Sequence, residues 1–137
     1  MGDYTYKVSL RLRHPTTASA EFTAELGVQP SRSWEAGAPR TTPKGTPLSG
    51  VNKETYWIAN YVEGASANAD LAAAVGGVLD KLAKHQAFFD ALSASGGRAE
   101  FFIGWFFDGN SGDVFSWKLL GRLAQLKIDL SLDVYPD

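Results

Sequence analysis

The amino-acid sequence predicts an α+β domain in which a four-stranded sheet packs against helices gathered mainly on one face. Strands of alternating polarity open and close the chain, a helix with a clear apolar stripe lies near its centre, and the other segments alternate between strand and helix. A chain of 137 residues, 45% of them hydrophobic, can bury a core without a disulfide or metal. We therefore expect residues 1–137 to form one two-layer sandwich, a ferredoxin-like variant with a long ordered Gly/Pro loop.

The first predicted strand covers residues 4–13, where apolar and polar side chains alternate. Pro15 ends it, because proline has no N–H to donate to a sheet. Thr16 or Thr17 is then placed to cap a helix that continues to Leu26. The apolar face of this strand consists of Tyr4, Tyr6, Val8, Leu10 and Leu12, and the polar face includes Lys7, Arg11 and Arg13.

The rest of the regular structure is predicted from the same periodicities. We expect a strand at 54–61, a long helix at 70–93, a strand at 98–107, a helix capped by Ser116 and a last strand at 128–135. Aromatic residues occupy both faces of the strand at 98–107. This pattern predicts a central strand covered on both sides.

Residues 28–53 are rich in glycine, proline, serine and threonine, yet they contain Trp34. We expect an ordered irregular excursion that Trp34 anchors as a structural lid. The other interpretation is an anion site, in which Arg32, Arg40 and Lys44 converge near a rim of the sheet and recognise an acidic group on a partner or small ligand. Pairing of these cations with carboxylates of the same chain is the competing account.

The polar faces of the strands predict a second candidate surface. It would be a sheet face without helices, lined by Arg11, Arg13, Glu100, Phe102, Phe106, Asp133 and Tyr135. Arg11, Arg13 and Tyr135 are candidate partner contacts there. Arginines and aromatics on a sheet also suit single-stranded RNA, although the strand at 98–107 departs from the RNP1 pattern. If residues 31–53 fold over this face, its aromatics form a second core instead.

Two carboxylates of the last strand, Asp129 and Asp133, lie about 13 Å apart by strand rise, which is too far for a glycosidase pair. We expect them to pair with Lys7, Arg11 or Arg13 if the first and last strands are neighbours.

Catalytic patterns are missing from the sequence. The chain has no cysteine and two histidines, of which His85 falls on the apolar stripe of the long helix and His14 at a strand end. It has no G-x-S-x-G turn, and "TPKGTP" lacks the G-K-[ST] order of a P-loop. We expect no catalytic residue, no metal and no cofactor, and the balance leans against an enzyme.

Charge and the amino-terminal sequence bear on compartment and partners. The net charge of −2 and the pI near 5.6 argue against a nucleic-acid-binding protein. The amino terminus lacks the apolar segment of a secretory signal, and no run is long enough for a membrane span. We expect a cytoplasmic protein without membrane attachment; the oligomeric state is not predicted.

Four stretches, "LRHPTTASAEFTAELGVQPSRSWEAGAPR", "TPKGTPLSGVNKETYW", "GGRAEFFIGWF" and "IDLSLDVYP", together resemble a bacterial family described as domain of unknown function 4279. The resemblance spans nearly the whole chain, with the motifs in order. It implies one fold over that length and places residues 31–57 within the family's signature. It implies no activity for any residue.

These observations predict a small non-catalytic binding or interaction module, of a regulatory or immunity type, that uses the Gly/Pro/Arg loop and the sheet face. A protein that binds a small anionic ligand, or an enzyme of unknown class, is the alternative. Single-stranded RNA binding on the sheet face is a further one.

Overall fold

The computed structural model describes residues 4–63, 70–107, 109 and 111–136. The sequence also predicts a short loop at 62–69 and a tight turn at 108–113, and both lie partly outside the described residues. The elements follow one another as β1 (Tyr4–His14), α1 (Ser19–Leu26), β2 (Arg32–Trp34), β3 (Pro39–Thr41), β4 (Pro47–Val51), β5 (Thr55–Val62), α2 (Leu71–Leu82), the 3-10 turn η1 (Ala83–His85), α3 (Gln86–Ala94), β6 (Arg98–Phe107), α4 (Trp117–Gln125) and β7 (Ile128–Pro136).

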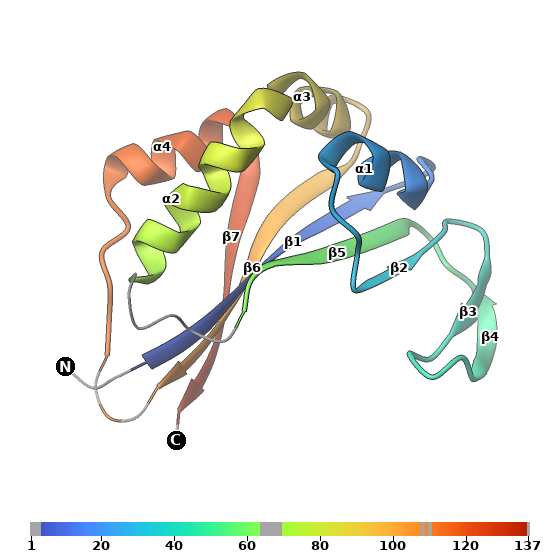
Figure 1. Cartoon of the computed structure of the whole chain (residues 1–137). Helices are drawn as coiled ribbons and strands as arrows, with labels where there is room; N and C mark the ends of the chain where they lie inside the picture. The colour runs from blue at the N-terminus through green and yellow to red at the C-terminus, as the bar shows by residue number, and fades with distance from the viewer. Residues whose placement is uncertain (1–3, 64–69, 108, 110, 137) are drawn as a thin grey trace.

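The main sheet is mixed and has five strands in the order β2-β5-β1-β6-β7 (Figure 1). Neighbouring strands are antiparallel except β6 and β7, which α4 connects as a parallel pair. The α+β class is thus confirmed. The sheet contains the expected four strands and, in addition, the short edge strand β2. A ferredoxin-like arrangement is not confirmed.

All four α-helices lie on one face of the sheet (Figure 1). The alternation of β1 explains this, because its apolar side chains project into the layer between sheet and helices. The core residues of the sheet are Tyr6, Val8, Leu10, Leu12, Trp57, Ala59, Ala99, Phe101, Ile103, Trp105 and Ile128. Those of the helices and their ends are Phe22, Leu26, Leu71, Val75, Val78, Leu79, Leu82, Phe89, Leu92, Leu119, Leu123 and Leu126.

The start of α1 differs from the prediction. Its N-cap position is Ala18, and the acceptor for the first helical N–H comes from Glu35, far along the chain. The backbone N–H groups of Thr16 and Thr17 instead donate to Nδ1 of His14, at 3.0 and 2.9 Å. The two threonines therefore belong to the turn that leaves β1, and neither is the N-cap.

The helix expected at 70–93 is two helices. Asp70 caps α2 by accepting a hydrogen bond from Ala73 N at 2.7 Å, as an N-cap carboxylate does. After Leu82 the chain tightens into η1 and leaves in a new direction as α3 (Figure 1). The two parts pack differently, since α2 contacts β1 and α4 whereas α3 contacts β6.

Residues 28–53 contain three short strands rather than an irregular loop. Strand β2 extends the edge of the main sheet beside β5, and β3 and β4 form a separate two-stranded hairpin. The hairpin projects beyond the start of β5 (Figure 1), and Phe106 remains 43% exposed on the helix-free face. The segment is therefore not a lid that seals this face.

Candidate functional site

The helix-free face of the main sheet is the first candidate surface, and we call it the open face. Its side chains alternate with core residues along each strand, because successive residues of a strand point to opposite sides. The open face includes Lys7, Ser9, Arg11 and Arg13 of β1, Tyr56, Ile58 and Asn60 of β5, Arg98, Glu100, Phe102, Gly104 and Phe106 of β6, and Asp129, Ser131, Asp133 and Tyr135 of β7.

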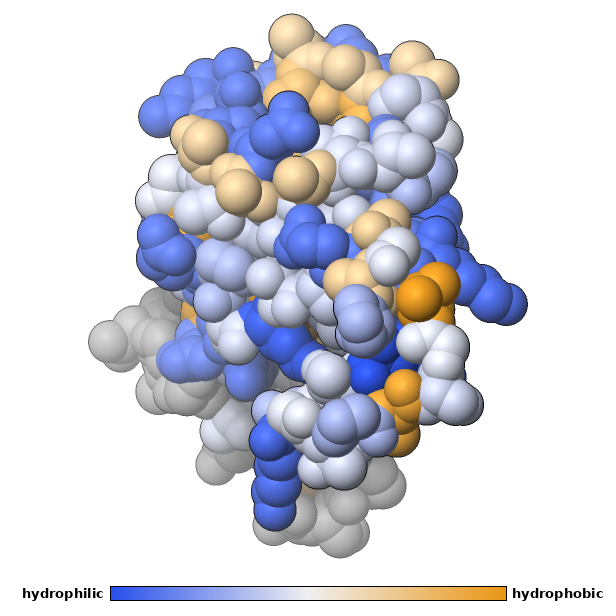
Figure 2. All heavy atoms as spheres, turned by 90° about the vertical axis from the view of Figure 1, so that its right-hand side faces the viewer, coloured by the Kyte–Doolittle hydropathy of each residue, from blue (hydrophilic) through white to orange (hydrophobic). Residues whose placement is uncertain are grey.

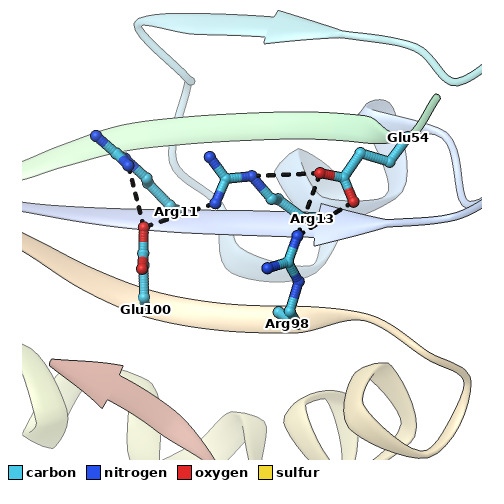
Figure 3. A network of polar contacts seen from close by, with 5 residues as sticks. All are labelled: Arg11, Arg13, Glu54, Arg98 and Glu100. Carbon is cyan, nitrogen blue, oxygen red and sulfur yellow. Dashed lines mark hydrogen bonds and ion pairs between the residues drawn. The ribbon is translucent and has the colours of Figure 1, made fainter. Parts of the chain in front are cut away.

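A network of ion pairs crosses one end of the open face (Figure 3). Glu100 accepts from Arg11 at 3.1 Å and lies 3.8 Å from Arg13. Glu54, just before β5, lies 3.5 Å from Arg13 and 3.2 Å from Arg98. The arginine charges of β1 are therefore compensated within the chain.

The condition on which these cations were expected to pair with Asp129 or Asp133 is not met, because the first and last strands are not neighbours. Strand β6 lies between β1 and β7, so Glu100 occupies the place beside Arg11 that the prediction gave to the last strand. Sequence periodicity gave the face of each carboxylate correctly but carried no information on which strands are neighbours.

Aromatic rings add a second kind of contact to the same arginines. The guanidinium carbon of Arg11 lies 3.7 Å from the ring centroid of Phe102, and that of Arg13 lies 5.1 Å from the centroid of Tyr56. Trp34, on the edge strand β2, stacks on Tyr56 with a centroid distance of 4.3 Å. These contacts order flat side chains across four neighbouring strands, β2, β5, β1 and β6.

A hollow of about 260 Å³ lies at the other end of the open face. Gly104 leaves room there, and the ring of Phe106 leans over it: a Cβ at position 104 would lie 3.1 Å from Phe106 Cε2. Phe106 stacks on Tyr135 with centroids 4.8 Å apart. The hydroxyl of Tyr135 donates to Asp133, and this hydrogen bond raises the pKa of Tyr135. Ser9, Asn60 and Lys7 also line the hollow.

A larger cavity, of about 650 Å³, lies where the β3–β4 hairpin meets β2 and the start of β5. Trp34, Arg40 and Lys53 line it, together with Glu54. Arg32 joins this group, since its guanidinium carbon lies 4.8 Å from the ring centroid of Trp34. Seen from the hairpin side, the surface is mainly hydrophilic with small hydrophobic areas (Figure 2).

We call Arg32, Arg40, Lys44 and Lys53 the cationic rim. All four are exposed, and none forms an ion pair within the part of the chain that the structure describes. Arg40 donates one hydrogen bond, to the carbonyl of Ser49 at 3.0 Å.

The family model for a domain of unknown function, DUF4279, matches residues 4–137. The chain belongs to the DUF4279 family. No curated protein and no solved structure matches it significantly. The family resemblance expected from the sequence is thus confirmed over the matched length.

The six predicted site residues of this DUF4279 domain fall into separate places: two lie around Trp34, two belong to the ion-pair network, and the other two lie elsewhere. Arg32 and Arg40 are both placed around Trp34, whereas Lys44 lies in the turn between β3 and β4. Arg11 and Arg13 belong to the network at one end of the open face, and Tyr135 lies at the hollow at its other end, with Lys7 and Asp133. Lys53, which lines the cavity beside Trp34, was not predicted as a site residue, because its approach to Trp34 depends on the hairpin.

The two histidines of the DUF4279 domain have structural partners. His14 is buried; its Nδ1 accepts two backbone N–H groups, so Nε2 carries the proton toward Ser95 Oγ, 2.9 Å away. His85 lies on the expected stripe and its Nδ1 is 2.6 Å from Glu25 Oε2. Within the described residues no three His, Asp or Glu side chains form a metal-binding group, and no helix is long and apolar enough to cross a membrane.

Proposed function

We propose that this DUF4279 domain is a non-catalytic binding module whose cationic rim binds an acidic segment of a partner protein. The observation that carries the proposal is a difference in ion pairing between two groups of cations. Arg11, Arg13 and Arg98 form ion pairs with Glu54 and Glu100, whereas the rim cations have no carboxylate partner among the described residues. An exposed cation without a partner can pair with a carboxylate of another molecule, because no ion pair within its own chain has to break first.

The surroundings of Trp34 support the same proposal. The indole stacks on Tyr56, has the Arg32 guanidinium over its ring, and lines the cavity that Arg40 and Lys53 also line. A fixed aromatic ring beside arginines is the residue combination found at energetically dominant positions of interfaces. The partner segment would place an apolar or aromatic group in the cavity and carboxylates against the rim.

The experiment is affinity purification with the tagged full chain as bait, together with proteins encoded beside its gene. Three baits are compared: the wild type, the double variant R40Q/K53Q, and the control K81Q/K84Q, which removes the same charge from exposed lysines of the helical layer. We expect the control to retain the partner and the rim variant to lose it. Binding should also weaken as salt rises from about 50 to 300 mM, because screening shortens the reach of exposed charges. Equal recovery by both variants would refute the proposal.

A small anionic ligand is the second candidate, and the cavity beside Trp34 favours it. A volume of about 650 Å³ lies within the range of small-molecule sites, about 300–1,000 Å³. Calorimetric titration of the same variants with small phosphates and carboxylates separates the two candidates. Saturable binding that R40Q/K53Q abolishes, without any captured protein, would favour the small ligand.

A further inference from the structure

Strand β7 forms an edge of the main sheet, opposite the edge formed by β2 (Figure 1). Leu132 and Val134 align with the buried residues Ile103 and Trp105 of β6, and so they lie on the helix side. They nevertheless remain 45% and 50% exposed. A long edge strand with exposed apolar side chains is a ready template for pairing with another strand.

We propose that β7 pairs antiparallel with β7 of a second copy across a two-fold axis perpendicular to the sheet. This axis joins two five-stranded sheets into one, keeps the helices of both copies on the same side, and places one residue of β7 opposite itself. The two copies then cover each other's exposed leucine and valine. The rim lies at the other edge of each sheet, so dimerisation leaves it accessible.

Charge selects the register. Three registers keep most of the strand paired, and they are centred on Ser131, Leu132 or Asp133. The first places Asp129 opposite Asp133 of the other copy, and the third places Asp133 opposite itself. Like charges directly opposite each other destabilise a strand pair.

The register centred on Leu132 avoids both conflicts. It sets Leu132 against Leu132 and Leu130 against Val134, all on the helix side. On the other face it sets Asp133 against Ser131. This self-complementarity is the reason that we assign a second copy, and not an unrelated strand, to the edge.

The absence of cysteine from the chain makes the register directly testable. In the proposed pair, the Cα atoms of position 132 lie about 4.5–5.5 Å apart, within the disulfide range of about 4.4–6.8 Å. Position 131 would lie diagonally across from its copy, at least about 7 Å away. We expect mild oxidation to give a covalent dimer for L132C and little for the matched control S131C. Preferential cross-linking of S131C, or no cross-linking by L132C, would overturn the proposal.

The mass of the unmodified full chain provides an independent measurement. Sedimentation should show a dimer, and L132E should raise its dissociation constant by at least about tenfold, because it opposes two carboxylates at the axis. The control V114E changes a valine that is 77% exposed outside β7 and should leave the dimer intact. A monomeric wild type at its highest soluble concentration, or equal dissociation by both variants, would refute the dimer. If L132E does not fold, the cysteine variants still decide.

Discussion

Glu35 accepts two hydrogen bonds from Ser19, one from the backbone N–H at 2.8 Å and one from the hydroxyl at 2.6 Å. The carboxylate thereby supplies the N-terminal cap that Ala18, with no polar side chain, cannot give to α1. It also fastens the segment after β2 to a helix on the covered side of the sheet. The Glu35 side chain therefore attaches the segment that leads into the hairpin to the first turn of α1.

Replacing Glu35 tests this cap. We expect E35A to lower the free energy of unfolding by about 1–2 kcal/mol, because the first helical N–H and the buried Ser19 hydroxyl both lose their acceptor. E35Q keeps one acceptor oxygen and should cost less. Urea denaturation monitored by circular dichroism measures both. Stabilities of E35A and wild type that agree within about 0.5 kcal/mol would mean that water replaces the cap.

Trp34 is partly buried, less than expected for an anchor deep within the structure, but its ring stacks on Tyr56. Complete burial would make W34A cost about 3–5 kcal/mol; for a half-buried stacked ring we expect about 2 kcal/mol. The matched control is W117A, since Trp117 is 78% exposed and should change stability by less than about 0.5 kcal/mol. Equal effects of the two substitutions in chemical denaturation would remove the anchoring role.

The ion pairs of the open face should contribute more to stability than those of the helical layer. Glu100 and Arg11 are each about a quarter exposed, whereas Asp80, which pairs with Arg122 at 2.6 Å, is 72% exposed. We expect E100Q to cost about 1–2 kcal/mol, because it leaves a partly buried guanidinium without its counter-charge, and D80N to cost under about 0.5 kcal/mol. Thermal or urea unfolding of the two variants checks the order. A larger loss for D80N would contradict it.

Tyr61 predicts a change of stability at alkaline pH. Burial raises the pKa of its hydroxyl from 10.0 to about 12. Between these values the unfolded chain loses the proton first, so the contribution of Tyr61 is fully present below pH 10 and is lost as the pH rises toward 12. The hydroxyl has no hydrogen-bond partner among the described residues.

The substitution Y61F should therefore leave stability at neutral pH unchanged or slightly higher, and it should flatten the loss between pH 10 and 12. Denaturation curves at several pH values measure both effects. A loss above about 1 kcal/mol at neutral pH would show that the hydroxyl makes a stabilising contact.

Local periodicity determined much of this fold. The strands at 4–13, 98–107 and 128–135 were predicted nearly to their observed ends, because alternation with period two is visible within each strand. Ser116 was predicted as a cap because capping is also local in sequence. Its hydroxyl oxygen accepts a hydrogen bond from the backbone N–H of Leu119, three residues away, at 3.1 Å. Features that depend on near neighbours in sequence can be read from the sequence.

Strand order and long-range partners were decided only by the tertiary structure. Whether Arg11 meets Glu100 or Asp133 depends on which strand lies beside β1, and local pattern does not specify that. The same holds for the cap on α1 from Glu35 and for the approach of Lys53 to Trp34. Such contacts form only when the whole sheet and its helices close around a single core, so their specificity comes from the combined packing of distant segments.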